Sequence, residues 1–206
     1  MQIVSPQAIK LARIETKERR LAKLDLMRKE NDPKVELALK YCLIYHAGQF
    51  RKGDKEPYYT HPVAVAHMLA KYGYNDTVTQ CIALLHDIVE ESLLKISHIK
   101  ETFGYEIANG IFILSRNKGN LTGGKMLSNK HYKVRLQLAS DTIKRVKIAD
   151  MITNTRDLQN LNPRGIRRKI KDAETFYIPM GREVCPKMVK ELERNIMKYK
   201  RKFNLR

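Results

Sequence analysis

The chain has 206 residues, 43% of them hydrophobic, which is enough to bury the core of one domain with appendages. Its 40 Lys and Arg residues against 22 Asp and Glu residues give a formal net charge of +18, which attracts polyanions such as nucleic acid, anionic membranes or phosphorylated small molecules. The sequence contains no apolar run of membrane-spanning length, no signal-peptide core and no CxxC pair. We therefore expect a soluble, cytoplasmic protein with reduced cysteines and no membrane partner.

Helical patterns cover nearly the whole chain. Two N-terminal segments begin with an N-cap residue followed by proline, Ser5-Pro6 and Asp32-Pro33, which is a start signal for helices. Further along, Gly73 ends one predicted helix and Gly104 separates two others. The remaining helical segments are residues 81–92, 130–141, 142–160, 163–181 and 186–203.

No alternating strand pattern, internal repeat or low-complexity tract interrupts this series, so the predicted class is all-α. Residues 1–32 form a basic helical extension, and residues 33–206 form one domain. The C-terminal portion of that domain, about residues 164–206, is the most basic part of the chain. Its clusters of Lys and Arg are typical either of a solvated face or of a surface that binds polyanions.

The window CIALLHDIVEES, residues 81–92, separates apolar from polar side chains when it is placed on a helix at about 100° per residue. Its apolar residues fill one arc, while His86, Asp87, Glu90 and Glu91 fill the opposite arc. Such a polar arc is typical of a solvent-exposed face or of a helix N-terminus. The acids lie late in this helix, where the helix dipole disfavours them. A third interpretation, that these side chains bind a cation, requires ligands from elsewhere in the chain.

A second predicted helix, TIKRVKIADMITNTRDLQN, supplies such ligands. Asp150, Thr153, Asn154 and Asp157 occupy positions i, i+3, i+4 and i+7 and therefore share one helical face. The loop RKGDKEPYYTHP adds an imidazole at His61. Together with the histidine and aspartate of the first helix, these groups make a mixed nitrogen and oxygen set. That set suits octahedral Mn, Fe or Co better than a structural zinc site.

These residues carry a resemblance to a known family. The pattern H…HD…D resembles the ligand signature of the HD-domain metal-dependent phosphohydrolases. The blocks HAGQFRKGDKEPYYTHPVAVAHML, ALLHDIVEES and VKIADMITNTRDL are similar to the hydrolase domain of RelA/SpoT-type proteins and their metazoan SpoT relative. The similarity covers about residues 35–160. Because the residues that follow are too few for a synthetase domain, the resemblance is to a small stand-alone alarmone hydrolase with a helical-bundle fold and a metal site in its core.

The resemblance implies a role for each matching position. The metal ligands, holding one Mn²⁺, would be His61, His86, Asp87 and Asp150. The catalytic pair acting on the attacking water would be Glu90 and Glu91, although the family usually has Glu-Asp there. The substrate-binding residues would be Arg51, Lys52, Tyr58, Asn154 and Asp157. His46 belongs to the same blocks, and we interpret it as a hydrogen-bonded structural residue.

The implied activity is hydrolysis of the 3′-pyrophosphate of ppGpp or pppGpp, which gives GDP or GTP and pyrophosphate. Two other interpretations stay open at this point. The same metal site could serve another nucleotide phosphohydrolase, either an NADPH 2′-phosphatase or a deoxynucleotide triphosphohydrolase. The basic chain could also be a non-catalytic protein that binds nucleic acid or nucleotides. Besides the phosphorylated nucleotide, a nucleic-acid partner and a homo-oligomer remain open.

Overall fold

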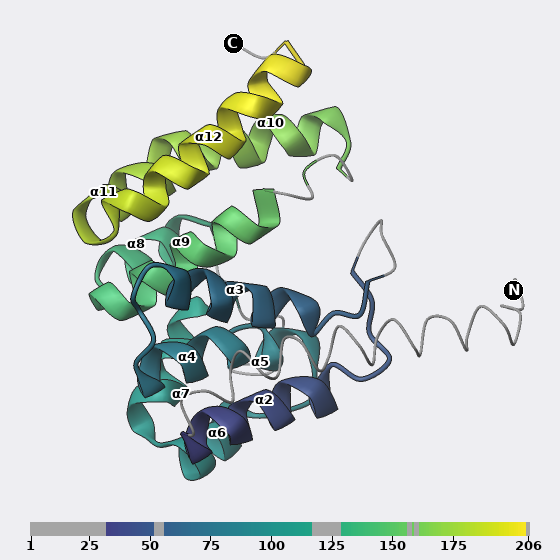
Figure 1. Cartoon of the computed structure of the whole chain (residues 1–206), viewed down its shortest axis with the longest axis vertical. Coiled ribbons are helices and arrows are strands. Elements are labelled where there is room, and N and C mark those ends of the chain that lie inside the picture. Colours follow the sequence, from purple (N-terminus) through teal and green to yellow (C-terminus); the bar gives the residue numbers. More distant parts are fainter. Residues whose placement is uncertain (1–31, 52–55, 117–128, 156–157, 159–160, 205–206) are drawn as a thin grey trace, which may run out of the picture.

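The computed structural model of the chain describes residues 32–51, 56–116, 129–155, 158 and 161–204 (Figure 1). Within these ranges every regular element is a helix, and the one strand-like pairing is an isolated bridge between Phe50 and Pro57. The predicted all-α class is therefore confirmed. None of the described helices is both long enough and apolar enough to span a bilayer.

The helices and the π-helical turn η2 have the following bounds: α2 Pro33–Tyr45, α3 Thr60–Lys71, α4 Thr77–Leu85, α5 Ile88–Glu91, α6 Ile96–Phe103, α7 Tyr105–Leu114, α8 Asn129–Gln137, α9 Asp141–Thr155, α10 Pro163–Asp172, η2 Ala173–Tyr177, α11 Ile178–Val184 and α12 Pro186–Lys202. The predicted start of α2 is confirmed, because the Asp32 side chain accepts a hydrogen bond from the Lys34 amide. Gly73 and Gly104 both have positive φ and lie at the predicted helix ends.

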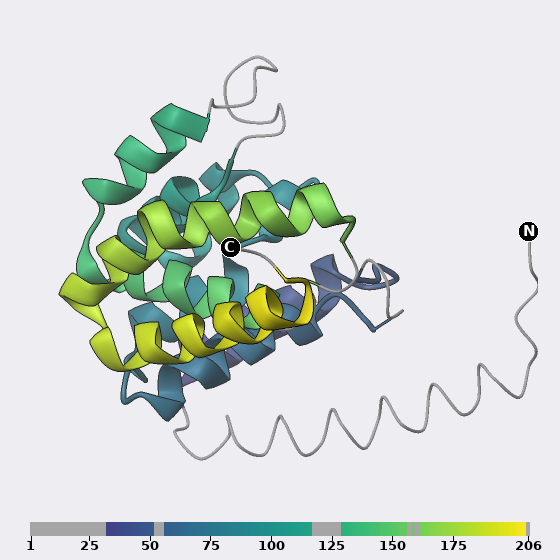
Figure 2. The same ribbon diagram turned by 90° about the horizontal axis from the view of Figure 1, so that it is seen from above.

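Helix α4 is the centre of the core. All of its residues from Thr79 to Leu85 are buried, because α2, α3, α7 and α9 pack around it. Helix α9 contacts α3 and α4 on one side and α11 and α12 on the other. Helices α10, α11 and α12 form the layer at one end of the longest axis, and α2 and α6 lie at the other end (Figures 1 and 2). Helix α9 thus links the core to the basic C-terminal layer.

The helix predicted over residues 81–92 is broken in the structure. Helix α4 ends at Leu85, and α5 starts again at Ile88 after a turn at His86 and Asp87. The reason lies in the His86 side chain, whose Nδ1 lies 2.8 Å from the Ala83 carbonyl oxygen. That carbonyl would otherwise accept the Asp87 amide in a continuous helix. The break changes the direction in which the histidine and aspartate point.

The run predicted as one helix over residues 163–181 also departs from regular α geometry. Helix α10 passes into η2, where the Ile178 amide donates to the Ala173 carbonyl five residues earlier, and then into α11. The chain continues from α10 through η2 into α11 without a loop, so the prediction of helical structure is confirmed. The hydrogen bonds across η2, however, are those of a π-helix and not of an α-helix. Lys52, Asp157, residues 117–128 and all but the last residue of the predicted extension over residues 1–32 lie outside the described residues.

Candidate active site

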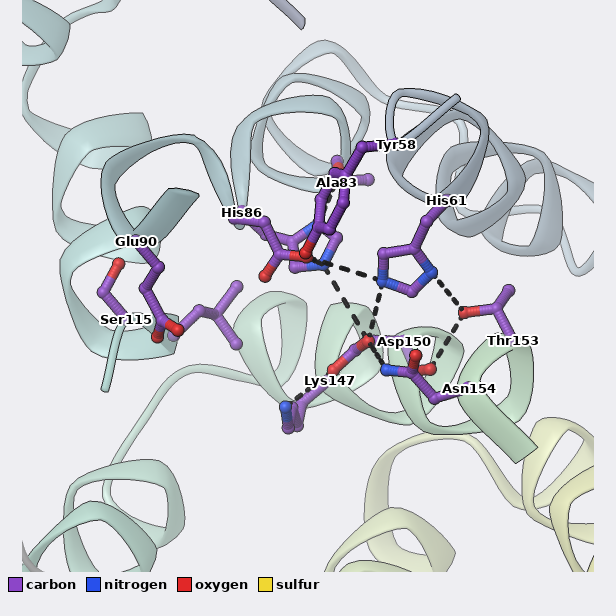
Figure 3. A network of polar contacts seen from close by, with 12 residues as sticks. Tyr58, His61, Ala83, His86, Glu90, Ser115, Lys147, Asp150, Thr153 and Asn154 are labelled. Atoms are coloured by element: carbon purple, nitrogen blue, oxygen red, sulfur yellow. Dashed lines mark hydrogen bonds and ion pairs between the residues drawn. The ribbon is translucent and has the colours of Figure 1, made fainter. Parts of the chain in front are cut away.

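Four side chains that are far apart in the sequence meet beside the core. His61 comes from the first turn of α3, His86 and Asp87 from the turn between α4 and α5, and Asp150 from the middle of α9 (Figure 3). Ligand atoms of His61, His86 and Asp87 all lie within 4.8 Å of one another, a grouping that could hold a metal ion. The structure therefore brings together the four predicted ligands.

The distances among these four groups are short and their surroundings are buried. His61 Nε2 lies 3.1 Å from Asp150 Oδ1 and 3.6 Å from Asp87 Oδ2. His86 Nε2 lies 3.3 Å from the same oxygen of Asp87 and 3.9 Å from Asp150 Oδ1. Two imidazole nitrogens and two carboxylate oxygens thus face a common point, and a cation there would remove the repulsion between the carboxylates.

In both histidines the ring nitrogen Nδ1 has a hydrogen-bond partner other than the four clustered side chains. His86 Nδ1 donates to the Ala83 carbonyl, and its buried Nε2 has no hydrogen-bond partner among the described residues. His61 Nδ1 lies 3.3 Å from Thr153 Oγ1, whose hydroxyl already donates to the Asp150 carbonyl and therefore accepts from the ring. Both Nε2 lone pairs are consequently left to face the carboxylates, which is the arrangement of metal-binding histidines. The donor set fits a divalent cation.

Electrostatics support the same assignment. Burial lowers the pKa of His86, but the negative charges of Asp87 and Asp150 outweigh burial and raise it to about 9. Burial raises the pKa of Asp87, while His86 and His61 outweigh that effect and hold it well below the usual range. The point between the side chains therefore attracts positive charge strongly, and a divalent cation competes there with a proton.

Lys147 is a site residue that the sequence analysis missed. Its Nζ lies 2.6 Å from Asp150 Oδ2, and the carboxylate overcomes the effect of burial and raises the lysine pKa well above its ordinary value. A lysine three residues before a candidate ligand aspartate shares its helical face, and that spacing was the available signal. Lys147 therefore stays charged and orients one oxygen of Asp150.

Three predicted substrate-binding residues lie at the same site. Tyr58 donates a hydrogen bond from its hydroxyl to Asp87 Oδ2 at 2.9 Å. Asn154 Nδ2 donates to Asp150 Oδ1 at 2.5 Å, and Asn154 Oδ1 accepts from Arg51 at 3.3 Å. Tyr58 and Asn154 thus orient the carboxylates directly, while Arg51 reaches the edge of the cluster through the asparagine.

A cavity of about 190 Å³ opens over the cluster. The candidate catalytic residues Glu90 and Glu91 line it, and a carboxylate oxygen of Glu90 accepts a hydrogen bond from the backbone amide of Arg116. The other lining residues are Tyr58, His61, His86, Asp87, Leu114, Arg116, Tyr132, Val146, Lys147, Asp150 and Asn154. The cavity is thus lined by carboxylates and by the cations Arg116 and Lys147, a lining that suits an anionic molecule next to a metal cation.

His46 is a buried structural residue, as its interpretation from the sequence anticipated. Its Nδ1 lies 2.8 Å from Gln49 Oε1, and its ring stacks on Tyr58 with 4.8 Å between the ring centroids. Gln49 Nε2 in turn donates to the backbone carbonyl of Glu91 at 2.5 Å. The pair therefore joins the end of α2 to the end of α5.

Replacing Gln49 by Leu should lower the free energy of unfolding by about 1–3 kcal/mol, because the buried His46 ring and the half-buried Glu91 carbonyl both lose a hydrogen bond. Chemical denaturation followed by circular dichroism measures the change. Gln137→Leu is the matched control, since Gln137 is exposed on α8. Equal stability of the two variants would show that the bridge between α2 and α5 contributes nothing.

Comparison with protein families identifies this arrangement. The family model described as "HD domain" matches residues 38–183, which include all four clustered side chains. The chain belongs to the HD-domain family. The His86-Asp87 pair in the turn after α4 lies within the matched residues.

Several relatives of this HD-domain chain have names that state an activity. It is 33% identical over 152 residues to the guanosine-3′,5′-bis(diphosphate) 3′-pyrophosphohydrolase of Haemophilus influenzae, covering 72% of this chain and 22% of that protein. A probable enzyme of the same name from Synechocystis is 34% identical over 147 residues, covering 68% and 19%. The bifunctional (p)ppGpp synthase/hydrolase SpoT of Escherichia coli is 31% identical over 139 residues, covering 66% and 20%. The chain spans about a fifth of the length of these relatives.

A solved structure shares the fold of this HD domain. It is that of a metazoan ortholog of SpoT, a protein described as one that "hydrolyzes ppGpp and plays a role in starvation responses", and it superposes with a TM-score of 0.71. The match covers 85% of this chain and 98% of that chain at 20% sequence identity. The overall arrangement of helices is therefore one that a solved structure also has.

Proposed function

We propose that the protein hydrolyses the 3′-pyrophosphate of ppGpp and pppGpp, giving GDP or GTP and pyrophosphate. The observation that carries the proposal is the cluster of two histidines and two aspartates beside a cavity that is lined by the candidate base Glu90 and by the cations Lys147 and Arg116. The relatives named as 3′-pyrophosphohydrolases support the choice of substrate.

His61, His86, Asp87 and Asp150 would hold one divalent cation, which we propose to be Mn²⁺. Mixed imidazole and carboxylate ligands with room for water suit this ion. When bound, the cation supplies Lewis acidity, which lowers the pKa of water and offsets charge on the phosphoryl oxygens.

The side chains of the protein itself account for the rest of the reaction. Glu90 accepts a proton from the attacking water as the water oxygen forms a bond to the phosphorus that carries the 3′ oxygen. The bond between that phosphorus and the 3′ oxygen breaks, pyrophosphate leaves, and a proton returns to the 3′ oxygen, which becomes the ribose hydroxyl of GDP or GTP. Lys147 and Arg116 lie where they can meet the negative charge of the pyrophosphate. Glu91 lies beside Glu90 at the cavity wall, and we assign it the second, supporting carboxylate role. Arg51, Tyr58 and Asn154 orient the nucleotide, and we assign Lys52 and Asp157 to the same group from the family pattern.

One experiment tests the proposal against its alternatives. The purified protein is incubated with Mn²⁺ and, separately, ppGpp, pppGpp, ppApp, NADPH and deoxynucleoside triphosphates, and the products are identified by chromatography. Pyrophosphate together with GDP or GTP is the expected result. Orthophosphate from NADPH alone, or triphosphate from the deoxynucleotides alone, would contradict the proposal.

Arg51→Ala should raise KM for ppGpp about ten- to a hundredfold and change kcat little. A hydrogen bond to a charged group contributes about 1.5–3 kcal/mol, and Arg51 lies at the edge of the cluster and not among its ligands. Steady-state kinetics at saturating Mn²⁺ measure both constants. Arg164→Ala serves as a control, because Arg164 is exposed on α10. A loss confined to kcat would place Arg51 in the chemical step instead.

A further inference from the structure

A row of cations follows the outer face of α12. Its buried face consists of Met188, Val189, Leu192, Ile196 and Tyr199, which anchor the helix in the core. The opposite face exposes Lys187, Lys190, Arg194, Lys198 and Arg201, at successive spacings of three, four, four and three residues. We name these five residues the α12 row. At 1.5 Å per residue the row is about 21 Å long.

The acidic residues of α12 form ion pairs with cations outside this row. Glu191 pairs with Lys71 at 2.9 Å and accepts the Tyr72 hydroxyl at 2.7 Å. Glu193 pairs with Arg182 at 2.6 Å. Among the residues that the structure describes, no carboxylate forms an ion pair with any member of the α12 row. Helix α10, in the same layer, adds further exposed positive charge at Arg164, Arg167, Arg168 and Lys171 (Figure 2).

We propose that the α12 row binds the phosphate backbone of double-stranded nucleic acid, independently of base sequence. A straight line of cations that have no ion-pair partner among the described residues suits a polymer of regularly spaced phosphates, of which B-DNA carries one per about 1.7 Å of helix axis. The described part of α12 has no exposed aromatic residue within the row on which unpaired bases could stack, and this favours a duplex over a single strand.

Other polyanionic partners fit this face less well. A helix that inserts into an anionic membrane needs several exposed apolar side chains, and Met197, 51% exposed, is the one large example within the span of the row. A protein interface needs a buried apolar or aromatic centre, which a face of lysines and arginines does not offer. The row also lies apart from the residues around the proposed active site, so it does not depend on the proposed function.

The test compares two triple variants of the full chain with equal changes in net charge. Lys190→Gln, Arg194→Gln and Lys198→Gln remove the middle of the α12 row. The control combines Lys40→Gln, Lys95→Gln and Lys100→Gln, exposed cations of α2 and of the start and body of α6. These two helices lie at the opposite end of the molecule from α12 (Figure 1). Binding to a fluorescent 20-base-pair duplex is measured by anisotropy from 50 to 200 mM NaCl.

Each phosphate contact contributes about 0.9 to the slope of log K against log salt for a duplex. We therefore expect the row variant to lose about 2–3 from the magnitude of the slope, and the control variant to keep the parental slope and affinity. Equal losses in both variants would show that net charge alone attracts the duplex and would overturn the proposal. So would binding of the parental protein to phosphatidylserine vesicles without binding to the duplex. Unchanged ppGpp turnover in the row variant would separate this surface from the active site.

Discussion

Asp87→Ala should remove the bound metal and reduce turnover of ppGpp to an undetectable level. Its Oδ2 lies within 3.6 Å of Nε2 of both His61 and His86, so the substitution removes a carboxylate oxygen that faces both imidazoles. It also leaves the Tyr58 hydroxyl without its acceptor. Elemental analysis after dialysis against Mn²⁺, together with a pyrophosphate-release assay, measures both effects.

Thermal stability gives a readout that does not depend on activity. A ligand that binds only the folded state at a hundred times its Kd adds about 2.7 kcal/mol of stability, so Mn²⁺ should raise the Tm of the parental protein. The Tm of Asp87→Ala should not respond. Asp141→Ala is the matched control, because Asp141 is an exposed carboxylate in the first turn of α9 that pairs with Arg145. Full metal occupancy in Asp87→Ala would refute the assignment of this residue as a ligand.

Glu90→Gln should lower kcat by about 10²–10⁴-fold, the usual effect of losing a general acid–base group, while metal and ppGpp still bind. Glutamine keeps an oxygen that can accept the Arg116 amide, so the end of α5 should keep its position. Rapid-quench kinetics measure the chemical step, and equilibrium dialysis with Mn²⁺ and labelled ppGpp measures binding. Turnover at the parental rate would assign the proton transfer to another group.

Substitutions at Glu91 distinguish its role from that of Glu90. Glu91→Asp gives the Glu-Asp pair that the resemblance to RelA/SpoT-type hydrolases implies, and it should keep or raise kcat if the carboxylate takes part in catalysis. Glu91→Gln should then lower it. The backbone carbonyl of Glu91 accepts from Gln49 in either variant, so the bridge to α2 is preserved. Equal activity of the two variants would limit Glu91 to a structural role.

Most of the fold was predictable from local patterns. The cap at Asp32 and the positive-φ glycines at 73 and 104 set helix ends through interactions within a few residues. At two places the structure departs from the predicted helices, because hydrogen bonds form there that the spacing of apolar residues does not predict. These places are the His86 side chain on the Ala83 carbonyl and the π-helical turn at Ala173–Tyr177.

The sequence by itself determined the all-α class and the four candidate ligands, because helix periodicity and residue type are local properties of the chain. Only the tertiary structure decided how these ligands meet. His61, Asp87 and Asp150 are separated by dozens of residues, and the packing of α3, α4 and α9 brings both carboxylates within 3.6 Å of the His61 imidazole. Side-chain directions likewise decide that Lys147 contacts Asp150. They also decide that Gln49 joins His46 to the Glu91 backbone. Such directions follow from packing in three dimensions, which residue spacing alone does not specify.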